Sequence, residues 1–146
     1  MESIEISEEP IAYQCSSEVE LSELVNCSIK LSCKTGFLLL LKDKQSFLKR
    51  LVPSYLNANL RFKEKNAKAK SISMEMLLFI AGTLRTEKAI AECGAIDNKS
   101  FMVFATSKQV FTKFSKAVKL KVLKEYKLEL DLDSASDVAQ LAFAED

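Results

Sequence analysis

The residues with the clearest chemical potential are the basic ones between positions 42 and 70. This segment has nine Lys or Arg residues against two acidic ones, a net charge of +7, although the whole chain of 146 residues carries only +1. Arg61, Lys65 and Lys68 are spaced four and three residues apart, so a continuous helix would place them on one side. Cations that converge on one stripe bind phosphates, and the pattern therefore favours a polyanion-binding surface.

Six residues of this segment are candidates for contacts with a nucleic acid. Cationic side chains bind phosphates, and asparagine amides can hydrogen-bond to sugars or base edges in unpaired RNA. The candidates are Asn59, Arg61, Lys63, Lys65, Lys68 and Lys70. The alternative interpretation is an ordinary solvated face, which a Lys-rich surface usually is.

The composition offers few parts for catalysis. The chain has no histidine, only three glycines and no GxSxG sequence. The usual general base, metal ligand, nucleophile elbow and phosphate-binding loop are therefore missing. A carboxylate site stays open as an alternative, and it would need two of Glu64, Glu75 and Glu87 in one cleft. We expect a protein with no catalytic residues and no cofactor.

The four cysteines do not form a metal-binding pattern. Cys15, Cys27, Cys33 and Cys93 are separated by 12, 6 and 60 residues, with no CxxC pair and no histidine to complete a zinc site. We expect reduced thiols, with neither a bound metal nor a disulfide.

Length and hydropathy set the class of fold that positions these residues. We expect one domain, residues 1–146, of mixed α/β class, with a sheet of about four or five strands wrapped by helices. The wholly apolar run at 37–41 is far shorter than a membrane helix, and the first residues are acidic rather than signal-like. The expected location is the cytoplasm, and also the nucleus in a eukaryote.

Hydrophobic periodicity and capping signals place the individual elements. Ser17 and Ser107 are candidate N-caps, Gly82 and Gly94 are candidate helix ends, and Pro53 predicts a kink or two abutting helices. The predicted strands lie near residues 4–6, 11–13, 37–41 and 101–105 and within 119–132, and the predicted helices near 18–32, 43–64, 77–81, 87–93 and 108–118 and after 133.

The apolar helix before Gly82 has two interpretations. Its residues fill more than one face, which is typical of a helix buried among others. Met76 and Phe79 fall on sides that such burial does not require, and exposed Met or Phe side chains suit a protein interface.

The order of elements in residues 72–105 resembles the kinase-binding small subunit of the KEOPS complex. In both, an apolar helix ends at a glycine, and a second short helix ends at Gly-Ile or a similar pair before an apolar strand. The matching residues are Glu75, Leu77, Leu78, Gly82, Lys88, Ala89, Ile90, Gly94 and Ile96. One departure is Arg85-Thr86, where the family has a Gln-Ile-like pair.

The resemblance implies a non-catalytic subunit of the complex that makes threonylcarbamoyladenosine in tRNA. Such a subunit docks on and stimulates a small atypical kinase, an ATPase, and binds the single-stranded 3′ end of tRNA. The indirect partners are a metal-bearing threonylcarbamoyl transferase and a small dimerising subunit, and no membrane is involved. The implied docking residues are Met76, Phe79, Leu141 and Phe143. A pure kinase-binding adaptor without RNA affinity is the alternative.

Overall fold

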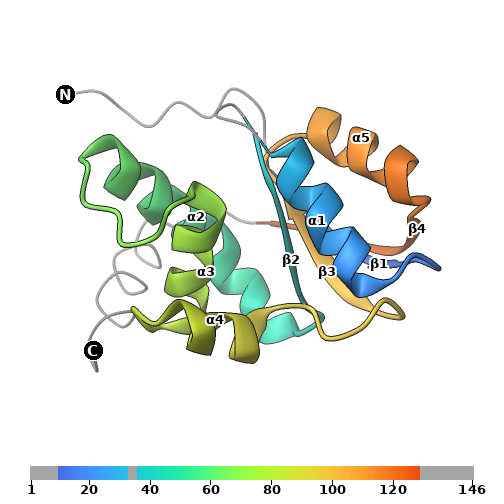
Figure 1. Ribbon diagram of the computed structural model, residues 1–146, viewed down its shortest axis with the longest axis horizontal. Helices are drawn as coiled ribbons and strands as arrows, with labels where there is room; N and C mark the ends of the chain where they lie inside the picture. Colours follow the sequence, from blue (N-terminus) through green and yellow to red (C-terminus); the bar gives the residue numbers. More distant parts are fainter. Residues whose placement is uncertain (1–9, 33–35, 129–146) are drawn as a thin grey trace. The chain divides into compact units, whose positions relative to one another are not determined.

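The computed structural model describes residues 10–32 and 36–128 (Figure 1). They form five α-helices and one four-stranded antiparallel sheet, which confirms the predicted mixed α/β class. Two compact units divide the described chain. Unit 1 consists mainly of residues 45–94, and unit 2 of residues from 7–44 and 95–127.

Unit 2 contains the whole sheet. Its strands are β1 (Ile11–Ser16), β2 (Leu38–Lys42), β3 (Phe101–Ala105) and β4 (Lys121–Tyr126), in the order β2-β3-β1-β4. Ala105 pairs with Leu38 on one side and Ile11 on the other, which fixes the register of β3 with β2 and with β1. A shift between Gln14 and Cys15 interrupts the pairing of β1 with β4.

Two helices of unit 2, α1 (Leu21–Leu31) and α5 (Lys108–Val118), pack on one face of this sheet. Leu24 of α1 and Phe114 of α5 are fully buried against alternate residues of the strands. All five residues of β3 and Leu38 to Leu41 of β2 are buried. The strand predicted at 37–41 is present one residue later, as Leu38–Lys42.

The prediction for α5 is confirmed at both ends. The hydroxyl of Ser107 accepts a hydrogen bond from the Val110 N–H at 3.3 Å, which satisfies one of the unpaired donors of the first turn. The helix ends at Val118, and the C-cap residue Lys119 has a left-handed φ of 51°, a conformation that glycine adopts most easily.

The predicted start of α1 was wrong. The helix begins at Leu21 instead of residue 18, and Glu20 is the N-cap without a side-chain capping bond. Ser17 lies outside the helix because its hydroxyl donates to the Val118 carbonyl at 2.9 Å and accepts from the Val19 N–H. A tertiary hydrogen bond thus takes the side chain that the sequence suggested as a cap.

Unit 1 begins with a 3-10 turn, η1 (Gln45–Phe47), and continues into α2 (Leu48–Lys63). Of the two alternatives predicted at Pro53, a kink or two abutting helices, the second was wrong, because α2 continues through this residue. Proline removes one helix hydrogen bond. Burial of Leu51 and Val52, and the bond from Arg50 Nη1 to the Ile80 carbonyl at 2.7 Å, support the helix around it.

Two shorter helices complete unit 1: α3 (Ile72–Ala81), which packs against α2, and α4 (Thr86–Cys93), which packs against α3. Gly82 ends α3 with a φ of 73°, as expected for a glycine C-cap. Gly94 follows α4 with a φ of −67°, so the ability of glycine to adopt a positive φ is not used here. A Cβ at this position would lie 2.7 Å from the Ile90 carbonyl oxygen, which explains the glycine sterically.

Two predicted elements, the strand near residues 4–6 and the helix after 133, lie outside the described residues. The segment predicted to contain one or two strands over 119–132 holds β4, and its part beyond residue 128 is also outside. None of the helices in the described part of the chain is long and apolar enough to cross a membrane.

Candidate nucleic-acid interface

A buried carboxylate organises the connection between α2 and α3. Glu75, in the first turn of α3, is fully buried, and its Oε1 accepts hydrogen bonds from the backbone N–H groups of Lys68 at 3.0 Å and Ala69 at 2.9 Å. The hydroxyl of Ser71 caps α3 by accepting from the Met74 N–H. A carboxylate that takes two backbone donors holds a loop in one conformation. The basic loop 64–71 is therefore fixed by α3.

The loop does not continue the helix. Helix α2 ends at Lys63, Lys65 has a left-handed φ of 60°, and the Asn66 N–H bonds back to the Arg61 carbonyl at 2.8 Å. The predicted helical stripe of Arg61, Lys65 and Lys68 was therefore wrong. The three side chains come together for a different reason, because the loop folds back beside the end of α2.

Arg61 has structural contacts as well as a cationic surface. Its Nε lies 3.9 Å from Oε2 of Glu75, and its guanidinium carbon lies 5.1 Å from the centre of the Phe79 ring. The Arg61 side chain is 26% exposed, whereas that of Glu75 is not exposed at all. Oε2 of Glu75 has no hydrogen-bond partner, so Arg61 supplies the positive charge beside a buried anion. Replacing Arg61 would therefore disturb the fold as well as the binding of any ligand.

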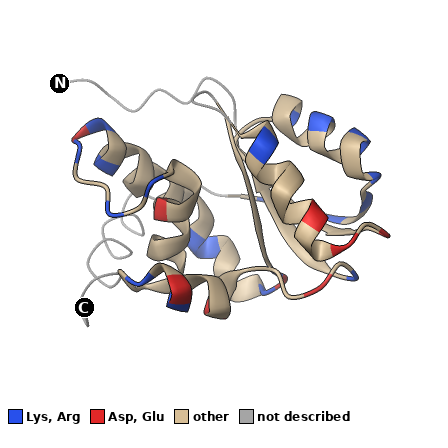
Figure 2. Ribbon diagram, viewed as in Figure 1, with Lys and Arg blue, Asp and Glu red and all other residues tan. Residues whose placement is uncertain are grey.

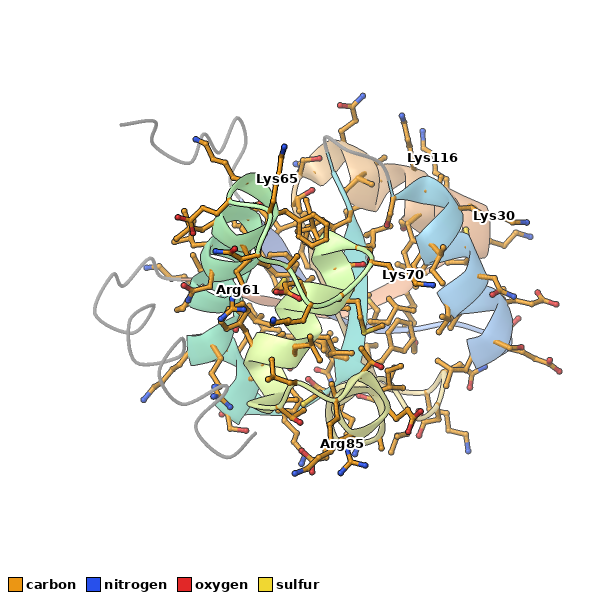
Figure 3. The ribbon with its side chains drawn as sticks, turned by 60° about the vertical axis from the view of Figure 1, so that its left-hand side comes forward. Lys30, Arg61, Lys65, Lys70, Arg85 and Lys116 are labelled. Atoms are coloured by element: carbon orange, nitrogen blue, oxygen red, sulfur yellow. The ribbon has the colours of Figure 1, made fainter. Side chains whose placement is uncertain are left out.

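These contacts surround a hollow of about 550 Å³ in unit 1, here called the α2–α3 hollow. The residues that line it combine three cations, two asparagines, one acid and three apolar side chains. They are Asn57, Leu60, Arg61, Glu64, Lys65, Asn66, Ala67, Lys68 and Phe79. A volume of this order is typical of sites for small ligands. Figure 3 shows Lys65 and Lys70 near the connection between α2 and α3, and Arg61 on α2.

The predicted contact residues differ in exposure and in whether they line the hollow. Lys63, Lys65, Lys68 and Lys70 are all exposed, as a phosphate contact requires. Asn59 is half-buried and does not line the hollow, whereas its neighbour Asn57 does. Asn66 was not predicted and was missed because its place depends on the turn at Lys65.

The predicted exposure of the apolar docking residues was wrong for two of the four. Met76 is 0% and Phe79 is 1% exposed, so α3 follows the core interpretation of its sequence. Glu75, a charged residue, is buried together with these apolar residues of α3. The sequence of α3 therefore has no polar face that would distinguish its core side from an exposed side. Leu141 and Phe143 lie outside the described residues.

The carboxylate-pocket alternative receives no support from the hollow. Of its three candidates, only Glu64 lines the α2–α3 hollow; Glu75 is buried beside it, and Glu87 is exposed on α4. No group of three or more metal-ligating residues is found within residues 10–32 and 36–128.

The three described cysteines are wholly or partly shielded from solvent. Cys15 and Cys93 are buried and Cys27 is half-buried, and no disulfide joins these three; Cys33 lies outside the described residues. Burial raises the pKa of the Cys15 thiol to about 12, so the thiol stays protonated at neutral pH.

A polar cluster in unit 2 has its hydrogen bonds satisfied internally. The Asp43 carboxylate accepts from the hydroxyls of Tyr126 and Ser100, and Ser100 accepts from the Gln14 amide at 2.9 Å. Burial and the bond to Asp43 raise the pKa of Tyr126 to about 12. This cluster ties strands of the sheet together.

Sequence reasoning missed a second basic segment. Residues 99–127 contain eight lysines and one acidic residue, a net charge of +7, equal to that of residues 42–70. These lysines are spread over a loop, a helix and a strand, so no single periodicity relates them. A charge count over the segment would have found them. Figure 2 shows Lys and Arg residues along α5 and in the connection between α2 and α3.

No protein-family model matches this sequence, and a search of curated proteins finds no relative.

Proposed function

We propose that this chain is a non-catalytic RNA-binding subunit of a KEOPS-like complex, which binds the single-stranded 3′ end of tRNA and docks on a small atypical kinase. The family comes from the resemblance of residues 72–105. The RNA-binding part is carried by one observation: Glu75 fixes loop 64–71 so that Arg61, Lys65 and Lys68 line a single hollow.

The lining of the α2–α3 hollow suits an unpaired nucleotide. Lys65 and Lys68 are exposed cations for phosphate oxygens, and the amide of Asn66 can reach sugar or base edges. Arg61 lies over Phe79 and presents a planar cation on which a base can stack. The combination of phosphate, base-edge and stacking groups favours a flexible single strand over a regular duplex.

A charge reversal that leaves the fold intact tests this function. The variant Lys65→Glu/Lys68→Glu/Lys70→Glu keeps Arg61, which the buried Glu75 needs, and keeps the backbone N–H groups that bond to Glu75. We expect its affinity for tRNA to fall by at least about a hundredfold at moderate salt, since several phosphate contacts are lost.

A matched control reverses three exposed cations of unit 1 that do not line the hollow. The variant Lys49→Glu/Arg85→Glu/Lys88→Glu changes the net charge equally and should bind tRNA with a much smaller loss. Trimming the terminal nucleotides from tRNA should weaken wild-type binding comparably to the hollow variant. Equal affinity of the two variants for tRNA would contradict the assignment of the hollow.

The kinase-docking part needs a variant outside α3. Met76→Glu would bury a charge in the core and unfold the chain, so it does not report on docking. Phe143→Glu is the appropriate change. We expect it to abolish pull-down of the kinase, because an unpaired charge in an interface costs several kcal/mol. Full kinase binding by Phe143→Glu, with native circular dichroism, would exclude that residue from the docking surface.

A further inference from the structure

Unit 2 has a basic hollow of its own, and none of the residues that line it belongs to the α2–α3 hollow. It measures about 750 Å³ and is formed by the connection between β1 and α1, the loop before β3, the end of α5 and the start of β4. Lys99, Lys119 and Lys121 line it, together with the single acid Glu18. Three of these four segments thus each contribute one lysine to a single concave surface. We call it the α5–β4 hollow.

Hydrogen bonds between these segments fix its walls. The Ser17 hydroxyl donates to the Val118 carbonyl at 2.9 Å, and the Ser17 N–H donates to the Asn98 carbonyl at 2.9 Å. The Asn98 amide in turn donates to the Val19 carbonyl at 3.0 Å. Ser17 and Asn98 are therefore used in holding the walls of the hollow together, whereas Lys99, Lys119 and Lys121 are exposed and accessible to a ligand.

The backbone at Lys119 is unusual. Within residues 10–32 and 36–128, Lys65 and Lys119 are the two non-glycine residues with positive φ, and each lines one of the two basic hollows. A left-handed lysine is disfavoured where glycine would serve. Such conformations are concentrated at functional sites. Lysine at position 119 therefore carries a conformational cost that glycine would avoid.

The basic surface extends from the hollow along α5. Ala117 lines the hollow, and Lys113 lies one turn before it on the same side of the helix. Lys116 is also exposed and, in Figure 3, its side chain extends away from unit 2. Lysines on β4 have a second explanation, because charges on an edge strand prevent strand-to-strand aggregation. That explanation does not apply to Lys99, Lys113, Lys116 or Lys119, which are not on the strand.

We propose that the α5–β4 hollow and the adjoining lysines of α5 bind the phosphate backbone of a double-helical RNA stem. The lining contains no aromatic ring and no arginine, so it lacks groups that stack on bases or bind them in a bidentate manner. Lysines act as point charges toward phosphates, and duplex RNA is recognised largely through its backbone and shape. The inference rests on the proposed function only in taking RNA as the partner.

Two RNAs separate this surface from the α2–α3 hollow. One is a blunt-ended hairpin whose loop is closed by a stable tetraloop, and the other is a short single strand that ends in the tRNA 3′ sequence. The variant Lys99→Glu/Lys119→Glu/Lys121→Glu should bind the hairpin at least about tenfold more weakly than wild type at about 100 mM salt. Its affinity for the single strand should stay within about twofold of wild type.

The control variant Lys49→Glu/Arg85→Glu/Lys88→Glu corrects for the change in net charge. Hairpin affinities that are equal in the control and in the α5–β4 variant would overturn the inference. If the reversal variant does not fold, the neutral variant Lys99→Gln/Lys119→Gln/Lys121→Gln replaces it, with the same selective loss expected.

The two proposals fail in different ways. Loss of single-strand binding in Lys65→Glu/Lys68→Glu/Lys70→Glu, with no selective loss of hairpin binding in the α5–β4 variant, supports the proposed function and overturns the inference. The opposite outcome, selective hairpin loss while the α2–α3 variant keeps its single-strand affinity, supports the inference and rejects the proposed 3′-end site.

Discussion

The α2–α3 hollow and the α5–β4 hollow are both basic and both include a lysine with left-handed backbone, yet their walls are held in different ways. In unit 1, the loop that carries the cations is fixed by the buried carboxylate of Glu75, and Arg61 serves both the hollow and this carboxylate. In unit 2, the lysines project from the loop before β3, the end of α5 and the start of β4, and the bonds that join these segments, such as that from Ser17 to Val118, do not involve the lysine side chains.

The difference separates two ways of building a cationic surface. Where the cation also neutralises a buried anion, binding and folding share residues, and charge removal changes both. Where exposed lysines project from segments that fold without the lysine side chains, charge can be removed with little effect on stability. The α2–α3 hollow is therefore expected to be the better ordered and the more selective of the two, and the α5–β4 hollow the more tolerant of mutation.

The largest expected effect comes from Glu75→Ala. The substitution leaves the N–H groups of Lys68 and Ala69 without their acceptor and Arg61 without its partner. We expect the free energy of unfolding to fall by about 3 kcal/mol, as measured by urea denaturation. Glu75→Gln keeps an acceptor for both N–H groups and should cost less, about 1 kcal/mol.

The matching change in unit 2 should have almost no effect on stability. Lys99→Ala, Lys119→Ala and Lys121→Ala remove exposed side chains and should each change the free energy of unfolding by no more than about 0.5 kcal/mol. If Glu75→Ala is equally mild, the carboxylate does not organise the loop and the contrast between the two hollows disappears.

An intermediate effect is expected where a lysine has positive φ. Lys119→Gly should stabilise the chain by up to about 1 kcal/mol, because glycine adopts a φ of 51° without strain. The same substitution should weaken hairpin binding several-fold. Lys116→Gly is the control, since glycine inside α5 should destabilise by about 1 kcal/mol. Thermal denaturation of the two variants shows whether Lys119 is kept at a cost; a loss of stability in both would argue that it is not.

The smallest effect concerns the reactivity of the thiols, and it tests whether Glu75 stabilises unit 1 alone. Cys93 ends α4 in unit 1, and Cys15 lies in the core of unit 2, where burial raises its pKa to about 12. Alkylation at neutral pH, followed by mass spectrometry, should be slow for both in the wild type. Glu75→Ala should accelerate reaction of Cys93 and leave Cys15 slow. Equal acceleration at both sites would mean that the two units open together.

The sequence predicted those parts of the fold that depend on local signals. A capping serine marks the start of α5, a short apolar run marks the strand at 101–105, and a glycine marks the end of α3 at Gly82. In each case, the residues that decide the element lie within it or next to it, so periodicity and capping rules were sufficient.

The candidate site was predicted by composition but not by geometry. The basic loop residues were found, yet their proposed helical stripe was wrong because Glu75, seven residues after Lys68, determines the loop through tertiary hydrogen bonds. Ser17 was misassigned for a similar reason, since its hydroxyl bonds to Val118 across 101 residues. Periodicity carries no information about hydrogen bonds between a side chain and a residue outside its own helix or strand.

The salt dependence of tRNA binding tests the central claim most directly. Affinity is measured between about 50 and 300 mM salt for the wild type and for Lys65→Glu/Lys68→Glu/Lys70→Glu. If these lysines contact phosphates of an unpaired strand, the plot of log affinity against log salt should become less steep by about 0.7 for each lost contact, or about 2 in total. An unchanged slope and affinity, with the fold intact, would contradict RNA binding at the α2–α3 hollow.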